Sequence, residues 1–330
     1  MKSSSTVPKG PIERAGRPSR PELVCQRLVD AISEVLIGKD RQVRNVLIGL
    51  LARGHVLIED IPGVGKTLLA LATARSMGVR FRRIQFTSDT LPSDVIGVNV
   101  YDPKKADFEF KEGPIFTEVL LADEINRTSP RTQSALLEAM AEGKVSVDGI
   151  TRRLPEPFFV LATMNPVERF GSFDLPESQL DRFLVSLSLG YPDRDHEMEI
   201  YEKDMEYVRA EEIEPVADPE IITRLQDRVR EVKVDASIME YLLDLVRATR
   251  DASSIRLGVS SRGGLHLKRA MQANALLEGR DFVIPSDLRT VFLPVTVHRI
   301  LLSSGSPDGS ERERKEEILR HIMQSIAGPV

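Results

Sequence analysis

Residues 58–67 constrain the fold of this chain more than any other segment. They read Ile-Glu-Asp-Ile-Pro-Gly-Val-Gly-Lys-Thr and begin inside an apolar run, residues 55–58, that is typical of a buried strand. A leucine- and alanine-rich stretch, residues 68–74, follows and is typical of a helix. A strand, a glycine turn and a helix start are the context in which backbone N–H groups surround phosphate oxygens. The segment therefore predicts a phosphate-binding loop in an α/β fold.

The residue types within this loop suit a bound nucleotide. The Lys66 ammonium can reach the β- and γ-phosphates, and the Thr67 hydroxyl can hold Mg²⁺. Asp60 occupies the position of the first glycine of the usual pattern, and we expect its carboxylate to point away from the phosphates. The alternative is a Gly-Lys-Thr turn without a ligand. The residues expected to contact the nucleotide here are Pro62, Gly63, Val64, Gly65, Lys66, Thr67 and Leu68.

A second candidate site feature is an apolar strand that ends in two acids. Residues 119–124 read Val-Leu-Leu-Ala-Asp-Glu and follow the loop by some fifty residues. In phosphate-loop NTPases an acid at such a strand end holds Mg²⁺, which predicts that role for Asp123. Glu124 can polarise an attacking water as a general base. For the strand that ends in two acids, taken alone, the alternative is a solvated strand end. Its combination with the phosphate loop favours a nucleotide hydrolase.

Composition and charge narrow the class of protein. The 330 residues are enough for two domains, and 41% are hydrophobic. The single cysteine, Cys25, excludes a disulfide framework, and the five histidines lack metal-ligand spacing. No apolar run has membrane-spanning length and no secretory signal is visible, so we expect a cytoplasmic protein. A net charge of −5 makes nucleic acid an unlikely main partner, although residues 1–20 are basic and are expected to form a disordered tail.

The order of expected elements divides the chain into two domains. Five strands, alternating with helices, predict a mostly parallel sheet between helices in residues 21–191. Residues 97–111 and 144–154 each predict a β-hairpin. Residues 192–215 are expected to be a linker, although residues 193–207 have a charged helical pattern. Residues 216–330 are expected to form an all-α domain with no strand. The expected strands are residues 55–60, 81–86, 118–123, 158–164 and 183–189, and the expected helices of the second domain are residues 218–232, 235–251, 262–278 and 286–300.

Several longer motifs resemble one family of proteins over residues 20–300. They include residues 113–116 (Gly-Pro-Ile-Phe), 121–127 (Leu-Ala-Asp-Glu-Ile-Asn-Arg), 133–140 (Gln-Ser-Ala-Leu-Leu-Glu-Ala-Met), 162–166 (Ala-Thr-Met-Asn-Pro) and 175–183 (Leu-Pro-Glu-Ser-Gln-Leu-Asp-Arg-Phe). In order and spacing they resemble MoxR-type AAA+ ATPases. The resemblance implies an AAA+ phosphate-loop NTPase core with two hairpin insertions and a C-terminal helical lid.

The resemblance also implies roles for residues outside the loop. Asn165 matches the first sensor, which orients the attacking water beside Glu124. Arg182 matches the arginine finger, which reaches the γ-phosphate of a neighbouring subunit. Arg262 matches the second sensor on the lid, although Ser261 stands where the family usually has proline. Ile37 and Gly38 match the segment that contacts adenine. Arg127 and Arg131 lie near the acids, and the sequence does not separate a subunit contact from a solvated position.

Three functions are compatible with these observations. The first is an ATP-hydrolysing remodeller of protein clients, which assembles as a homo-oligomeric ring, expected to be a hexamer, and works with a von Willebrand A-domain partner. The second is a nucleic-acid motor, which the acidic charge disfavours. The third is a nucleotide-gated scaffold with little turnover, which the complete set of reactive residues disfavours.

Overall fold

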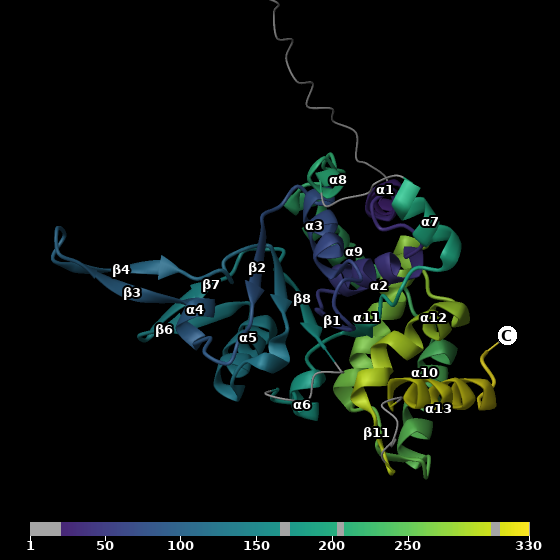
Figure 1. Cartoon of the computed structure of the whole chain (residues 1–330). Helices are drawn as coiled ribbons and strands as arrows, with labels where there is room; N and C mark the ends of the chain where they lie inside the picture. Colours follow the sequence, from purple (N-terminus) through teal and green to yellow (C-terminus); the bar gives the residue numbers. More distant parts are fainter. Residues whose placement is uncertain (1–20, 166–171, 203–207, 305–310, 330) are drawn as a thin grey trace, which may run out of the picture.

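The computed structural model describes residues 21–165, 172–202, 208–304 and 311–329 (Figure 1). The segment predicted to be a basic tail, residues 1–20, lies outside the described residues, as does Pro166 of the Asn165-Pro166 pair. None of the described helices is long and apolar enough to cross a membrane.

A five-stranded parallel sheet forms the centre of the first part of the chain, as predicted. Its order is β2-β5-β8-β1-β9, so β8 lies between the strand that precedes the phosphate loop and the strand that ends in two acids. The strands are short and mostly buried, as in sheets covered on both faces. Their bounds are Val56–Glu59 (β1), Phe81–Gln85 (β2), Val119–Asp123 (β5), Phe159–Met164 (β8) and Val185–Leu187 (β9).

Alternating side chains along these strands face two separate hydrophobic clusters. Val56 and Ile58 pack into one cluster with helices α1, α2 and α3, and Leu57 packs into the other with α4 and α5. This period of two is expected where successive residues point to opposite faces. The sheet is therefore enclosed by helices on both sides. The helices are Pro21–Ser33 (α1), Asp40–Leu51 (α2), Lys66–Ser76 (α3), Pro92–Ile96 (α4) and Pro130–Glu142 (α5), with a short 3₁₀ turn at Ile125–Arg127 (η1) and a helix at Glu177–Leu180 (α6).

Both predicted hairpins are present and lie together as an arm that projects from the core (Figure 1). The first pairs β3 (Gly97–Asp102) with β4 (Asp107–Glu112), and the second pairs β6 (Lys144–Val147) with β7 (Ile150–Arg153). The second turns at Asp148 and Gly149, which both have positive φ, the requirement of a tight hairpin turn. Asn99 donates a 2.6 Å hydrogen bond to Asp148 and so joins the two hairpins.

The second part of the chain is helical, with one exception to the prediction. The four predicted helices are present as α9 (Pro219–Glu231), α10 (Ala236–Asp251), α11 (Ser261–Leu277) and α12 (Pro285–Thr296). The expectation that this part holds no strand was wrong, because β10 (Ile255–Leu257) pairs with β11 (Leu301–Leu302). These strands are two or three residues long, too short to show an alternating pattern. A 3₁₀ turn, η2 (Val297–Arg299), and a fifth helix, α13 (Glu311–Ser325), complete it.

Two further boundaries differ from the expected ones. The last strand of the sheet is only Val185–Leu187, although Phe183, Val185, Leu187 and Leu189 alternate with other residues over 183–189. Beyond it, the Leu189 N–H donates to the Asp60 carboxylate and not to a strand carbonyl. The segment expected to be a linker contains α7 (Arg194–Glu202) and α8 (Val208–Glu211). Its described residues, 192–202 and 208–215, are therefore a structured part of the molecule.

The helical second part of the chain, called the lid below, contains a buried ion pair between Arg280 and Asp287. Asp287 is 1% exposed and accepts hydrogen bonds from Arg280 (2.6 and 2.7 Å), Asn274 (2.7 Å) and the backbone of Ile284 (2.8 Å). We expect Asp287→Asn to lower the free energy of unfolding by about 3 kcal/mol, because Arg280 loses its partner in a buried setting. Chemical denaturation measures this change.

The matched control is Asp227→Asn, which removes the carboxylate from an exposed pair with Arg53 at 2.8 Å. That change is expected to cost at most about 1 kcal/mol. Equal losses in the two variants would contradict the assignment of stability to the buried pair.

Candidate nucleotide site

The phosphate loop has the backbone form that the sequence predicted. Gly63 and Gly65 have φ values of 85° and 89°, in the left-handed region that favours glycine. Gly65 is the N-cap of α3, and its missing side chain leaves the first N–H groups of the helix accessible. Lys66 and Thr67 open the helix and are half-buried. The loop can therefore surround an anion with backbone donors at a helix N-terminus.

The Asp60 carboxylate points away from the loop, as expected, and it fixes the chain that follows β9. It accepts hydrogen bonds from the backbone of Leu189 (2.6 Å) and Gly190 (2.8 Å) and from the hydroxyl of Ser188 (3.0 Å). Asp60 is 5% exposed, so these donors replace its water. The carbonyl of the same residue accepts from the Lys66 ammonium at 2.6 Å. The acid at this unusual position therefore has a structural task.

The predicted acids and the predicted sensor meet at one edge of the sheet. We call the edge where the strands end the carboxyl edge and the opposite one the amino edge. Asp123 ends β5. Asn165 follows β8, the strand that lies between β5 and β1, so both residues lie at the carboxyl edge with the loop. The Thr163 hydroxyl donates to Asp123 Oδ1 at 2.6 Å and accepts from the Glu124 N–H at 2.8 Å, which fixes the strand end.

The charges at this edge influence one another. Burial lowers the pKa of the Lys66 ammonium, and the nearby Asp60, Asp123 and Glu124 carboxylates oppose that shift. The four groups therefore share one electrostatic environment. Hydroxyl and carboxylate oxygens are the ligands that Mg²⁺ prefers, so Thr67 and Asp123 fit that ion chemically. Among the described residues, no group of three or more His, Cys, Asp or Glu could hold a metal ion. Mg²⁺ is usually held by one or two protein ligands together with substrate phosphates, so this finding agrees with that mode.

Strand β2 supplies two residues that the sequence analysis missed. Gln85 Nε2 donates to Glu124 Oε2 at 2.6 Å, and Arg83 Nη2 donates to Asp123 Oδ2 at 2.6 Å. Arg127 Nε also lies 3.2 Å from Glu124 Oε2, whereas Arg131 is exposed on α5. Gln85 and Arg83 could be assigned to this site only by knowing that β2 lies next to β5, and the sequence alone does not give the strand order.

A cavity of about 350 Å³ adjoins the loop and has the size and lining of a nucleobase pocket. Ile37, Gly63, Val64, Gly65 and Leu68 line it, as the sequence analysis expected of nucleotide contacts. Its other wall was not foreseen, because it comes from Tyr191, the last residue of the expected core, and from the segment expected to be a linker. That wall contains Tyr191, Pro192, Glu197, Ile200 and Tyr201.

Two residues expected to contact the nucleotide, one in the phosphate loop and one at the base, do not line this cavity. Pro62 is exposed and does not line the cavity. Gly38 has a φ of 70° and lies under the His196 ring, where a Cβ atom would be 2.6 Å from His196 Cγ. Gly38 therefore permits α7 to close over the pocket and is a positioning residue for its wall.

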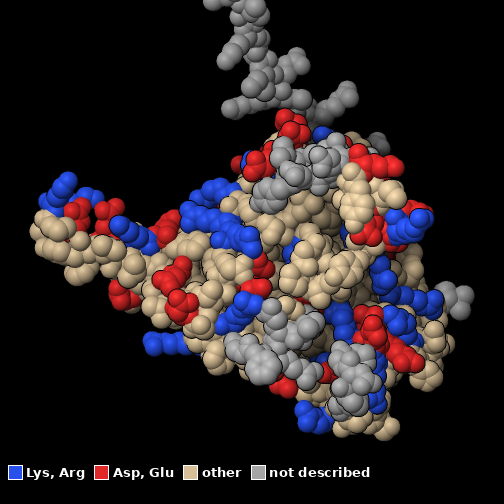
Figure 2. Space-filling view, viewed as in Figure 1, with Lys and Arg blue, Asp and Glu red and all other residues tan. Residues whose placement is uncertain are grey.

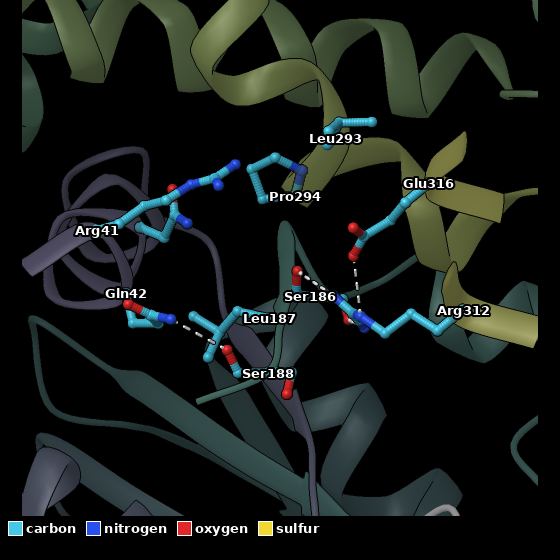
Figure 3. Close-up of a pocket in the computed structure, with 10 residues that line it drawn as sticks. Arg41, Gln42, Ser186, Leu187, Ser188, Leu293, Pro294, Arg312 and Glu316 are labelled. Atoms are coloured by element: carbon cyan, nitrogen blue, oxygen red, sulfur yellow. Dashed lines mark hydrogen bonds and ion pairs between the residues drawn. The ribbon is translucent and has the colours of Figure 1, made fainter. Parts of the chain in front are cut away.

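A smaller cavity of about 120 Å³ lies between α2, β9, α12 and α13 (Figure 3). On one side Arg312 of α13 reaches Glu59 Oε1 and Ser186 Oγ, each at 2.8 Å, and Arg312 also pairs with Glu316 at 3.3 Å. Glu59 directly precedes Asp60. The charged groups around this cavity thus connect the last lid helix to the base of the phosphate loop.

Arg182 and Arg262 are not brought to the loop of their own chain. Arg182 lies three residues before β9, and the next residues join the start of β1 through a 2.8 Å bond from the Leu184 N–H to the His55 carbonyl. This is the amino edge, and β1 separates it from the loop by about 10 Å. Arg182 Nη1 donates to the Leu137 carbonyl at 2.7 Å. Arg262 lies two residues after Ser260, whose hydroxyl donates to Asp181 at 3.1 Å.

The fold and this site define an AAA+ ATPase, and comparisons with known proteins identify the family. The profile of the ATPase family associated with various cellular activities (AAA) matches residues 55–185, and that of the AAA lid domain matches residues 247–322. Chaperone MoxR1 of Mycobacterium tuberculosis is 38% identical over 314 residues, 92% of this chain and 82% of that protein. YeaC of Bacillus subtilis is 48% identical over 92% of this chain and 94% of that protein.

A solved structure agrees with this assignment. A crystal structure from Cytophaga hutchinsonii, of a protein assigned as an ATPase, superposes with a TM-score of 0.83 at 34% identity and covers 94% of this chain and 96% of that one. The chain therefore belongs to the MoxR family of AAA+ ATPases. It binds nucleotide and hydrolyses ATP.

The position of Asp60 predicts the effect of restoring the usual glycine. We expect Asp60→Gly to lower the free energy of unfolding by about 2–4 kcal/mol, because the buried N–H group of Leu189 and the partly buried N–H group of Gly190 lose their acceptor. ATP affinity is not expected to rise, because the carboxylate does not face the loop interior. Thermal melting and nucleotide titration measure the two quantities. A stable variant that binds ATP more tightly would contradict this reading of Asp60.

Proposed function

We propose that this ATPase is a chaperone-like remodeller of protein clients, which assembles as a ring with ATP bound between subunits. One observation carries the ring: the candidate site is divided between the two edges of the sheet. The loop and acids are at the carboxyl edge, and Arg182 is at the amino edge. A ring with head-to-tail contacts would bring the two edges of neighbouring subunits together.

In this proposal the residues of one carboxyl edge bind and orient ATP. The loop N–H groups and Lys66 hold the phosphates, and Asn165 orients the attacking water. Glu124 accepts the proton of that water as its oxygen attacks the γ-phosphorus. Mg²⁺ held by Thr67 and Asp123 would supply neutralisation of phosphate charge. Arg182 of the neighbour, and Arg262 beside it, would stabilise the charge that develops in the transition state.

Glu124 needs to change partners before it can act as the base in this proposal. Its carboxylate is engaged by Gln85 at 2.6 Å and by Arg127 at 3.2 Å. Both donors contact the same oxygen, Oε2, and so occupy the lone pairs that could accept a proton there. We infer that assembly or ATP binding frees Glu124 from Gln85, which would restrain hydrolysis in the isolated subunit.

The hairpin arm is the proposed client surface. Tyr101 and Phe108 pack edge to face with ring centroids 5.4 Å apart and are 52% and 66% exposed, and Ile150 of the second hairpin is 56% exposed. In Figure 2 the arm carries Lys or Arg and Asp or Glu side by side, with uncharged surface between them. Exposed aromatic groups in a mixed-charge setting suit polypeptide better than nucleic acid.

The name of the chaperone MoxR1 supports protein clients. The remaining parts of the proposal rest on the family resemblance and the sequence. They are a hexameric ring, a von Willebrand A-domain partner, clients that need maturation or insertion of a metal or cofactor, and a cytoplasmic location.

The base assignment predicts a variant that binds ATP but hydrolyses it slowly. We expect Glu124→Gln to keep ATP affinity and to lose about 10²–10⁴-fold in turnover, because an amide does not accept the water proton. Glu118→Gln is the matched control, since Glu118 lies at the other end of β5 and pairs with Arg80 at 2.9 Å. Phosphate release measures turnover. Near-normal turnover in Glu124→Gln would remove Glu124 from the base role.

The divided site predicts rescue between two inactive variants, and this experiment tests the proposed function. We expect Arg182→Ala to bind ATP and to lose ~10³-fold in hydrolysis, and Lys66→Ala to bind ATP weakly. In mixed rings the intact loop of the first variant would receive Arg182 from the second, so turnover should return.

Subunit exchange is confirmed first with labelled protein. Failure to recover turnover at any mixing ratio would count against a shared site. A ring that requires all its sites to act together is recognised separately, because wild-type subunits would then also lose activity when diluted with Lys66→Ala.

A further inference from the structure

Asp181, the residue before Arg182, has a carboxylate that connects two elements of the lid. Its Oδ1 accepts from Arg299 Nε at 2.9 Å, and its Oδ2 accepts from the Ser260 hydroxyl at 3.1 Å. Ser260 is the N-cap of α11, and Arg299 ends η2 after α12. Arg182 directly follows Asp181, and Arg262 lies two residues after Ser260. The hydrogen bond between Asp181 and Ser260 therefore joins the two segments that carry these arginines.

Arg299 is a buried guanidinium whose donors are all used. Its side chain is 1% exposed, and besides the Asp181 carboxylate it contacts the carbonyls of Asp181 (3.5 Å), Phe183, Leu184 (3.3 Å) and Val295 and the ring nitrogens His266 Nδ1 and His298 Nε2 (2.7 Å). These contacts engage all three guanidinium nitrogens, which carry the five N–H groups of arginine. Four of the seven contacted atoms belong to the segment 181–184, which contains Arg182.

The charge states at this cluster agree with that geometry. Burial lowers the pKa of Arg299 to about 10, and Asp181 opposes the shift, so the guanidinium is protonated at neutral pH. Burial, and then the charge of Arg299, lowers the pKa of His266 to about 3, so its ring is neutral and can accept the hydrogen bond.

We propose that Arg299 and Asp181 are positioning residues for hydrolysis in the neighbouring subunit, holding Arg182 and Arg262 as one unit fixed to the lid. This inference rests on the proposed function, because it assumes that Arg182 acts across the subunit boundary. The guanidinium fixes the backbone on both sides of Arg182, and the carboxylate fixes the start of the helix that carries Arg262. A movement of the lid would therefore move both arginines together relative to the neighbour's ATP.

The competing reading is that the cluster only stabilises the fold. Burial of a paired charge is compatible with both readings, since removal of one partner is costly in either case. They differ in one respect: a positioning defect lies in the site of the neighbour, whereas a folding defect reduces the activity of the variant's own loop. Mixed rings separate the two.

The experiment uses Asp181→Asn in the full-length chain, with ATP affinity, turnover and ring assembly measured. We expect ATP affinity to change less than about twofold and turnover to fall ~10²-fold, because a displacement of about 1 Å at a catalytic group has that effect. Mixing with Lys66→Ala subunits should restore turnover, because their Arg182 is correctly held. The matched control is Asp287→Asn, which breaks the other buried lid ion pair and touches neither arginine. It is expected to melt earlier but to hydrolyse ATP at the wild-type rate when folded.

Each outcome decides the inference. Turnover at the wild-type level in assembled Asp181→Asn overturns it, and so does a loss that Lys66→Ala subunits do not restore although they restore Arg182→Ala. Failure to restore Arg182→Ala itself would instead count against the shared site. Arg299→Lys is the second variant if Asp181→Asn does not fold. Lysine keeps the charge beside Asp181 but not the fork that reaches Phe183 and Leu184, so we expect a partial, rescuable loss. Full activity in assembled Arg299→Lys would then overturn the inference.

Discussion

The common direction of the five strands in the parallel sheet determines at which edge each residue of the candidate site lies. Because all five strands run the same way, every residue that follows a strand lies at one edge and every residue that precedes a strand lies at the other. The phosphate loop, the two acids and Asn165 follow strands, whereas Arg182 precedes one. No local rearrangement of a loop brings these groups together within one chain, since β1 lies between them. This separation is the basis of the proposed ring.

The lid contacts both edges, and this explains how the two halves of the site can communicate. At the carboxyl side Arg312 of α13 reaches Glu59, next to the phosphate loop, and at the amino side Arg299 reaches Asp181, next to Arg182. Both contacts are charged pairs that are partly or fully shielded from water, where their orientation is well defined. In the proposed ring, occupation of one nucleotide site would therefore bias the arginines that the same subunit presents to its neighbour.

Much of the fold and part of the candidate site could be predicted from local patterns. The loop at residues 58–67 and the strand that ends at Asp123 are continuous in sequence, and their residue types have narrow chemical uses. The base-pocket wall could not be predicted, because Tyr201 belongs to a charged helical segment with no nucleotide motif, and Tyr191 lies just before that segment. Gln85 and Arg299 were missed for a related reason: each acts on a residue far away in sequence, and only the strand order and the lid packing bring them together.

Asp60 illustrates how an apparent departure from a motif can follow from the surrounding structure. A glycine at this position would satisfy the turn, but the chain after β9 has a buried N–H group at Leu189 and a partly buried one at Gly190 that need an acceptor. The carboxylate supplies it and ties the loop to the segment that continues into Tyr191 and the base pocket. The same segment receives the Lys39 ammonium at the carbonyls of Leu189 (2.7 Å) and Tyr191 (2.9 Å). The phosphate loop and the base pocket are thus joined by Asp60 from one side and by Lys39 from the other, and Lys39 also lines the pocket.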